Sequence, residues 1–280
     1  MNDEDVAKTA VYTIRTIAPE CGDVGRPFDG RVTALIPCYG KAAFVELAVS
    51  SCLRQTVPFE SVRVLLMDEA SAAMKEALES MSPKITCYVS ERLDPVTARN
   101  ALFMLLETDW LVFLDGDDEL EDNFLEELSK TNGAIRYGLN TDFLPDGQKW
   151  KKFPNRGNIP ADHPAQALCQ NMTCLMHRDV YEDLGLDPEL AFAMEDTDFV
   201  MRLLKQKKWL LTVSPDTGYF YRLCVPGQLT SDSVTYSKNA RKLLLKHGIW
   251  LLYELKSLDY DGLDGLINDV TEVLHGNRGT

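Results

Sequence analysis

The sequence predicts an α/β fold in which a mostly parallel sheet is flanked by helices. Short apolar segments alternate with segments of helical periodicity along the first half of the chain, which is typical of strand–helix–strand units. The apolar segments are hydrophobic along their whole length, as expected for strands of a parallel sheet that is covered on both faces. With 280 residues, the chain is long enough for one large domain or for one domain with appendages.

The first half of the chain alternates predicted strands with predicted helices. The strands are 31–37, 61–67, 84–89 and 110–114, and the helices between them are 41–55, 71–81 and 95–107. The second half is less regular. It contains a predicted strand at 134–140, a loop at 144–164, a polar segment that becomes helical within 191–209, and a strand followed by a loop within 214–231. Sheets of this kind bind ligands at the carboxyl ends of their strands, which is where polar residues gather in this chain.

The chain divides into three predicted parts. Residues 1–30 end in a run of turn-forming residues and are expected to be a poorly packed or disordered lead-in. Residues 31–235 form the α/β domain. Residues 236–280 carry two predicted helices, of which the first, 237–258, is amphipathic. Its apolar face could pack on the core, pair with a second copy of the chain in a homo-oligomer, or touch a membrane, and packing on the core is the commonest outcome.

Composition and charge restrict the partners and the compartment. The net charge is −14, from 29 basic and 43 acidic residues, and binding to nucleic acid requires clustered lysine and arginine, so no nucleic-acid partner is expected. The chain opens with acidic residues rather than a signal peptide, and no apolar run reaches the ~18 residues that indicate a membrane span. The seven cysteines contain no CxxC and fit reduced thiols. We expect a cytoplasmic protein without a transmembrane segment.

The segment FLDGDDEL, residues 113–120, places four carboxylates directly behind a predicted strand. A solvated acidic turn is a common feature at such a position. A calcium-binding EF-hand loop matches the spacing of the acids, but Leu120 stands where that loop needs glycine, and the preceding segment is a strand. A D-x-D site, in which two carboxylates hold Mg²⁺ or Mn²⁺ on a diphosphate, is consistent with the sharp turn that Gly116 allows.

Six segments, taken in chain order, together resemble the inverting glycosyltransferases of family 2, which have the GT-A fold. The segments are VTALIPCYG (32–40), SSCLRQT (50–56), LLMDEAS (65–71), TARNAL (97–102), FLDGDDEL (113–120) and MEDTDFVMRLL (194–204). Each motif is weak by itself, whereas six of them in the family's order and at its spacing are a strong signal. The resemblance runs from Arg31 to Ser233 and implies a GT-A, Rossmann-like sheet followed by a C-terminal helical extension.

The resemblance implies which residues bind the nucleotide. Residues 31–120 would form the nucleotide-binding half of the domain, and residues 121–235 the acceptor half. The residues implied in the nucleotide pocket are Pro37, Tyr39, Asp68, Glu69 and Arg99. Arg99 would lie near the nucleotide or support the acidic strand ends.

The resemblance also implies the metal ligands and the base. Asp115 and Asp117, with Asp118 as a third candidate, would hold the sugar and the Mn²⁺ or Mg²⁺ on the diphosphate. Asp196, preceded by Glu195, would be the general base that takes the proton of the acceptor hydroxyl. Basic residues at 148–156 or Arg222 could neutralise the diphosphate.

Some of these residues could have a structural role instead, and two positions differ from the family pattern. Asp68 and Glu69 could cap the helix predicted at 71–81, and Glu195 and its neighbours could cap the helix that follows them. Glu119 is expected to begin the next helix rather than to touch the ion. Gly40 stands where the family has asparagine, and Glu69 where it has a second aspartate, so the identity of the nucleotide stays open.

The implied function is a metal-dependent inverting transfer of a sugar from a nucleotide-sugar, expected to be UDP-linked, to a hydroxyl of a glycan, lipid-linked or other acceptor. A sugar-phosphate nucleotidyltransferase is one alternative, although PCYGKAAF lacks the glycines of that class. A non-catalytic scaffold on a transferase-like domain, working through the 237–276 helices, is the other. The fingerprint sequences of dinucleotide-binding dehydrogenases and P-loop ATPases do not occur in the sequence.

Overall fold

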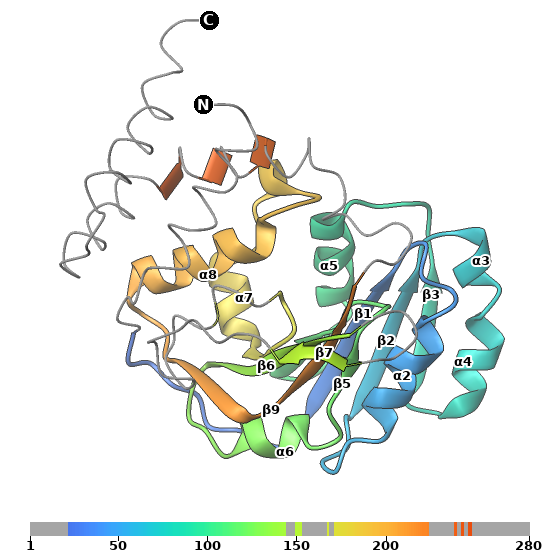
Figure 1. The fold of residues 1–280 in the computed structure, drawn as a ribbon, viewed down its shortest axis with the longest axis horizontal. Coiled ribbons are helices and arrows are strands. Elements are labelled where there is room, and N and C mark those ends of the chain that lie inside the picture. The colour runs from blue at the N-terminus through green and yellow to red at the C-terminus, as the bar shows by residue number, and fades with distance from the viewer. Residues whose placement is uncertain are drawn as a thin grey trace, which may run out of the picture.

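The computed structural model of the chain describes residues 22–143, 149–152, 167, 171–223 and six residues near the C-terminus, namely 238, 239, 242, 243, 246 and 247. This part of the chain contains a nine-stranded sheet in the order β3-β2-β1-β4-β8-β6-β9-β5, with β7 paired to β6 (Figure 1). The strands are β1 (Val32–Cys38), β2 (Ser61–Leu66), β3 (Ile85–Val89), β4 (Trp110–Phe113), β5 (Glu119–Leu120), β6 (Ile135–Phe143), β7 (Lys149–Lys152), β8 (Leu175–His177) and β9 (Leu211–Arg222).

The sheet is parallel in its first half and mixed in its second. β1 pairs with β2 and β4 in parallel, and β2 pairs with β3 in parallel. β8 then lies antiparallel to both β4 and β6, while β6 and β9 are parallel neighbours. The predicted α/β class with a mostly parallel sheet is therefore confirmed. The antiparallel strands β5 and β8 were not predicted, because two- and three-residue strands carry too few residues to show a periodicity.

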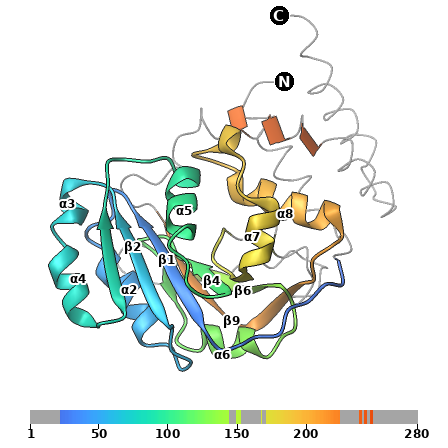
Figure 2. The same ribbon diagram turned by 180° about the vertical axis from the view of Figure 1, so that it is seen from behind.

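Helices cover the sheet on both faces (Figures 1 and 2). The helices are α2 (Val45–Leu53), α3 (Glu69–Ala72), α4 (Lys75–Met81), α5 (Pro95–Phe103), α6 (Phe124–Ser129), α7 (Arg178–Leu184) and α8 (Glu195–Gln206), with a 3-10 turn, η2 (Pro188–Leu190). Side chains alternate along β1, so that Leu35 joins a core built with α5, α7 and α8, and Ala34 and Ile36 join a second core with α2, α4 and α6. This alternation explains why the strand is hydrophobic along its whole length.

Three predicted elements differ in the structure. The segment 144–164, predicted as a loop, contains strand β7, which pairs with β6. The helix expected over 71–81 is two short helices, α3 and α4, separated at Ala73 and Met74. Glu119 does not begin a helix, because it lies in β5 and pairs with β9, and the next helix begins at Phe124.

Residues 22–30 are packed against the domain, contrary to the expectation of a poorly packed lead-in. Val24 forms a bridge with Trp209, the Arg26 guanidinium lies 2.9 Å from an oxygen of Asp179, and the Phe28 ring meets Trp110 edge-on at 5.7 Å. The sequence predicted poor packing because this segment is rich in turn-forming residues. In the structure, its apolar and basic side chains contact residues that are distant in the sequence. Residues 1–21 lie outside the described residues.

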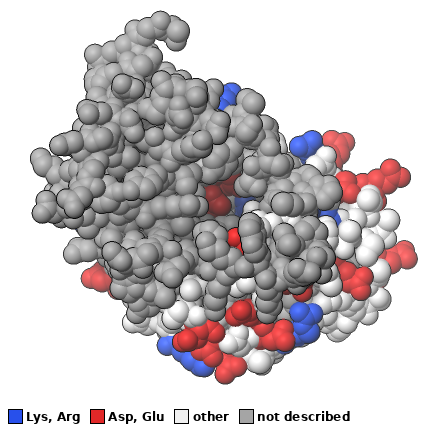
Figure 3. Space-filling view, in the orientation of Figure 1, with Lys and Arg blue, Asp and Glu red and all other residues white. Residues whose placement is uncertain are grey.

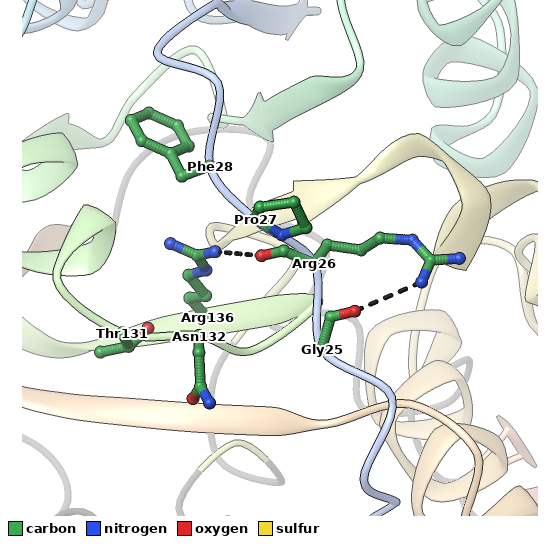
Figure 4. Close-up of a pocket in the computed structure, with 7 residues that line it drawn as sticks. All are labelled: Gly25, Arg26, Pro27, Phe28, Thr131, Asn132 and Arg136. Atoms are coloured by element: carbon green, nitrogen blue, oxygen red, sulfur yellow. Dashed lines mark hydrogen bonds between the residues drawn. The ribbon is translucent and has the colours of Figure 1, made fainter.

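A hollow of about 360 Å³ lies beside this segment, at the amino ends of β1 and β6 (Figure 4). The buried Arg136 guanidinium forms one wall, stacks 4.4 Å from the centre of the Trp110 ring, and donates hydrogen bonds to the carbonyl oxygens of Gly133, Leu128 and Arg26. Burial lowers the pKa of Arg136 to about 10. These carbonyl oxygens compensate the lost hydration of the buried guanidinium, and the bond to Arg26 attaches residues 22–30 to the sheet. Arg136 therefore has a structural role at this hollow.

The described residues of the C-terminal segment pack on the domain. Leu243 is fully buried in the core that contains α8. The side-chain amide of Asn239 donates to the carbonyl oxygens of Leu190, Ala191 and Ala193 at 3.1–3.3 Å. At these positions the segment packs on the core, as the commonest of the three alternatives predicted. The rest of both predicted C-terminal helices lies outside the described residues, and pairing with a second copy stays a prediction.

The described surface agrees with the acidic composition. On the face drawn in Figure 3, acidic side chains gather over the region of α3 and α4 and around α6. Among the described residues there is no helix with both the length and the apolar character needed to cross a membrane.

Candidate functional site

The predicted site residues come from strand ends that share one edge of the sheet. β1, β2 and β4 are parallel neighbours, so their carboxyl ends bring the PCYG turn, Asp68 and the DGDD segment to the same edge. At Gly116 an added Cβ would lie 3.2 Å from the Pro37 carbonyl oxygen, so the DGDD turn passes close to the end of β1. The small glycine allows this close approach.

Arg99 joins the DGDD segment to the acidic pair of α8. Its guanidinium donates to Asp115 at 2.9 Å through one terminal nitrogen and to Glu195 at 3.0 Å through the other. Arg99 is 5% exposed, and although burial alone would lower its pKa, the facing Asp115 and Glu195 raise it. Of the two predicted positions for Arg99, the structure shows it supporting the acidic strand end. Two acidic clusters that are far apart in the sequence are thus joined by one cation.

Asp117 is paired with a lysine that the sequence analysis did not single out. The Lys41 ammonium donates to Asp117 Oδ2 at 2.6 Å, and the two side chains are 11% and 10% exposed. Burial raises the pKa of Asp117, and Lys41 opposes this rise. Lys41 follows the PCYG turn directly, and a basic residue immediately behind that strand end was the signal that could have identified it.

Asp118 and Glu119 are engaged by β9 and its neighbours. Asp118 Oδ1 accepts from the backbone N–H of Arg222 at 3.0 Å, and its Oδ2 accepts from the side-chain amide of Asn171 at 3.3 Å. Burial, followed by the charges of Asp117 and Asp115, raises the pKa of Asp118 well above its usual range. The guanidinium of Arg222 donates to Glu119 at 2.8 Å. Asn171 was not expected here, since a lone asparagine in an irregular segment carries no recognisable pattern.

Glu195 and Asp196 lie in the first turn of α8, where the helix dipole favours negative charge. Burial, together with the neighbouring Asp196, raises the pKa of Glu195 to about 7. Burial also raises the pKa of Asp196, whose Oδ1 accepts from the Thr197 N–H at 2.6 Å. The helix begins after Met194, which has a left-handed backbone (φ 72°), as has Phe192 (φ 78°). Such conformations are strained for residues other than glycine, and they cluster at functional sites.

Asp68 serves as the N-cap of α3, as the structural alternative predicted. It accepts from the Ser71 N–H at 2.9 Å and from the Gly40 N–H at 2.7 Å, which ties the end of β2 to the PCYG turn. These hydrogen bonds outweigh burial and lower the pKa of Asp68. Glu69 is exposed, and Tyr39 is 37% exposed with the Arg92 guanidinium 4.5 Å from its ring centre. Within the described residues, no hydrogen bond or ion pair joins the side chain of Tyr39 or Glu69 to the acidic cluster, so their nucleotide-binding role stays a prediction.

The donor set at the strand end suits a hard divalent cation only in part. Mg²⁺ and Mn²⁺ prefer oxygen ligands, and one or two carboxylates are enough when substrate phosphates supply the rest. Asp115 and Asp117 supply such oxygens, and each already faces a protein cation. The described residues contain no cluster of three or more Asp, Glu, His or Cys side chains that could hold a metal without a substrate. The residues therefore fit such a cation only where a substrate diphosphate supplies the remaining ligands.

Comparison with known proteins shows the family to which the chain belongs. Residues 33–185, more than half of the chain, match the family described as Glycosyl transferase family 2. The chain belongs to glycosyl transferase family 2. The family agrees with the resemblance that the motif order predicted, and it does not fit the nucleotidyltransferase alternative.

Solved structures show the same fold for this family 2 chain. The crystal structure of S. aureus TarS 1–349 aligns with a TM-score of 0.58 at 14% identity, over 89% of this chain and 72% of the TarS chain. The same TarS segment in complex with UDP-GlcNAc aligns with a TM-score of 0.59 at 15% identity, over 87% and 71% of the two chains. The likeness at this identity confirms a GT-A-like α/β fold.

A curated relative of this family 2 chain is the minor teichoic acid biosynthesis protein GgaB of Bacillus subtilis (strain 168). It is 21% identical over 232 residues, which cover 76% of this chain and 25% of GgaB. The chain thus spans about a quarter of the length of that relative.

Proposed function

We propose that this family 2 glycosyltransferase moves a sugar from a UDP-sugar to an acceptor hydroxyl with inversion, with Asp196 as the general base and Mn²⁺ or Mg²⁺ assisting at Asp115 and Asp117. The bridge that Arg99 makes between Asp115 and Glu195 carries the proposal. An inverting transfer needs one carboxylate group near the diphosphate and another near the attacking hydroxyl, and the bridge holds two such groups at a fixed separation.

Asp196 suits the role of base better than Glu195. Glu195 is 7% exposed, and one of its carboxylate oxygens accepts a hydrogen bond from Arg99. Asp196 is only partly buried and has no ion pair among the described residues. Burial raises the pKa of Asp196, which makes its carboxylate a stronger proton acceptor. Glu195 and Arg99 are then positioning residues that hold the start of α8 against the DGDD turn.

Side chains of the protein would bind and orient the nucleotide-sugar donor. Asp115, held by Arg99, and Asp117, held by Lys41, would face the diphosphate and the sugar, and Tyr39 would contact the nucleotide. Lewis-acid stabilisation of the departing diphosphate is the chemistry that a divalent cation supplies there when it is bound.

The donor and acceptor classes are proposed from the relatives. TarS has been solved in complex with UDP-GlcNAc and with UDP, which supports a UDP-sugar donor. GgaB is a teichoic acid biosynthesis protein, so hydroxyl-bearing teichoic acid chains are the first acceptors to test. The cytoplasmic location stays a proposal from the sequence.

The test substitutes Asp196→Asn and measures two properties, the binding of UDP with Mn²⁺ by calorimetry and the release of UDP from UDP-GlcNAc in the presence of water or teichoic acid. We expect UDP binding to be retained and UDP release to fall by about 100-fold or more, the usual contribution of a general base. Asp183→Asn is the matched control, because Asp183, on α7, pairs with Lys208, which follows α8, and neither residue belongs to the candidate site. Normal turnover of Asp196→Asn would refute the assignment of the base.

A further inference from the structure

Lys41 lies at this edge of the sheet, and the motifs that resemble family 2 assign no role to it. It lies between the end of β1 and the start of α2, and its ammonium is 2.6 Å from Asp117 Oδ2. Lys41 as a whole residue is 9% exposed, which is unusual for lysine. A buried lysine needs a partner that compensates the lost hydration of its ammonium. Lys41 and Asp117 therefore form a buried ion pair within the candidate site.

The neighbouring cations are directed to other groups. Arg99 bonds to Asp115 and Glu195. Arg222 donates to the backbone carbonyl oxygen of Asp117 at 2.9 Å and to Glu119, and its backbone N–H donates to Asp118. Among the described residues, the ion pair shown for the carboxylate of Asp117 is the one with Lys41.

A divalent cation at this carboxylate would be opposed by the Lys41 ammonium. Mg²⁺ lies about 2.0–2.1 Å from its carboxylate oxygens, and an ammonium at hydrogen-bond distance from the same oxygen would be a close like charge. Two positive charges a few ångströms apart repel strongly where water is scarce. A cation at Asp117 is therefore expected to bind more tightly once the ammonium has moved away. A lysine is able to do so, because its four-carbon stem is flexible.

We propose that Lys41 is a built-in counter-ion of the cation subsite, which holds Asp117 while the donor is absent and must be displaced when a divalent cation binds. The inference rests on the proposed function, since it concerns the cation that would arrive with the donor diphosphate. It makes Lys41 the residue that keeps the affinity for the free metal ion low, so that the cation enters together with the nucleotide.

Titration of the full chain with Mn²⁺, without nucleotide, tests the proposal through the electron paramagnetic resonance signal of the free ion. Lys41→Met removes the charge, and we expect it to bind Mn²⁺ at least about tenfold more tightly than the wild type, as for the removal of one nearby like charge. Lys41→Gln keeps a hydrogen-bond donor for Asp117 and is expected to do the same if Lys41→Met fails to fold. The double variant Lys41→Met, Asp117→Asn should lose the gain.

Lys75→Met is the matched control, because it also removes one positive charge but lies on α4, where its ammonium donates to the Cys87 carbonyl oxygen. Indistinguishable Mn²⁺ affinities of the Lys41 variants and the wild type would overturn the proposal. So would metal-free UDP binding that Lys41→Met abolishes, since Lys41 would then replace the cation rather than compete with it. Either result leaves the role of Asp196 unaffected, because that role is tested by turnover.

Discussion

Arg99 is the residue on which the arrangement of the site depends most directly. It bridges Asp115 and Glu195 and is itself buried, so its removal leaves the buried Glu195 without a partner. An unpaired buried charge costs much more free energy than an exposed ion pair contributes. The same bridge therefore matters for stability and for the geometry of the base.

Arg99→Met is expected to lower the free energy of unfolding by about 3 kcal/mol. The measurement is urea denaturation above pH 7, because burial raises the pKa of Glu195 to about 7 and the carboxylate must be ionised in the native protein. Arg178→Met is the control, since Arg178 pairs with the exposed Glu182, and it should cost less than about 1 kcal/mol. Equal losses of unfolding free energy in the two variants would show that the Arg99 bridge stabilises the protein no more than an exposed ion pair does.

Among the elements, the pair β6 and β9 supports the second half of the site. β9 ends at Arg222, which contacts the DGDD segment, and β6 lies beside it over most of its length. At Gly218 a Cβ would lie 1.5 Å from the Leu139 carbonyl oxygen, so the two strands approach each other too closely for any larger residue. Gly218 thus sets the separation of β6 and β9.

Gly218→Ala is expected to destabilise the protein by about 3 kcal/mol, because the added methyl group overlaps a backbone atom that can move away only by shifting the strand. Thermal unfolding followed by circular dichroism checks this. Ser214→Ala in the same strand adds no atom and should cost about 1 kcal/mol or less. A Gly218→Ala protein as stable as the Ser214→Ala protein would contradict the observed strand separation.

The start of α8 is a second element whose position depends on distant residues. Phe192 and Met194 have left-handed backbones, and the Asn239 amide holds the carbonyl oxygens of Leu190, Ala191 and Ala193. The C-terminal segment therefore stabilises the strained loop that leads to Glu195. A motif search finds the acidic pair but not this support.

At the scale of the whole molecule, Asp198 fastens the C-terminal segment to the domain. It is fully buried and accepts from Arg202 at 2.7 Å, Lys246 at 2.8 Å and His247 at 2.7 Å. Burial alone would raise the pKa of Asp198, but the hydrogen bonds from His247, Lys246 and Arg202 lower it to about 2. A carboxyl group whose pKa is lower in the folded state stabilises the protein above its unfolded pKa.

The stabilisation from Asp198 is therefore expected to be present above pH ~4 and to disappear as the pH falls towards ~2, a loss of about 2 kcal/mol. Urea denaturation across this range measures it. Asp198→Asn should be less stable than the wild type near neutral pH and should lose less stability on acidification. Parallel pH profiles for the two proteins would contradict the assignment.

The sequence determined the α/β class, the parallel strands β1 to β4 and the positions of DGDD, Arg99 and the Glu195–Asp196 pair, because buried strands and strand-end carboxylates leave local patterns. The folded chain was needed to show that Arg99 joins the two clusters, that Lys41 pairs with Asp117 and that Glu119 lies in a strand beside Arg222. It also decided the short strands β5 and β8 and the packing of residues 22–30. These features depend on side chains that meet across the fold, and the pairing of buried charges follows from how the chain brings them together.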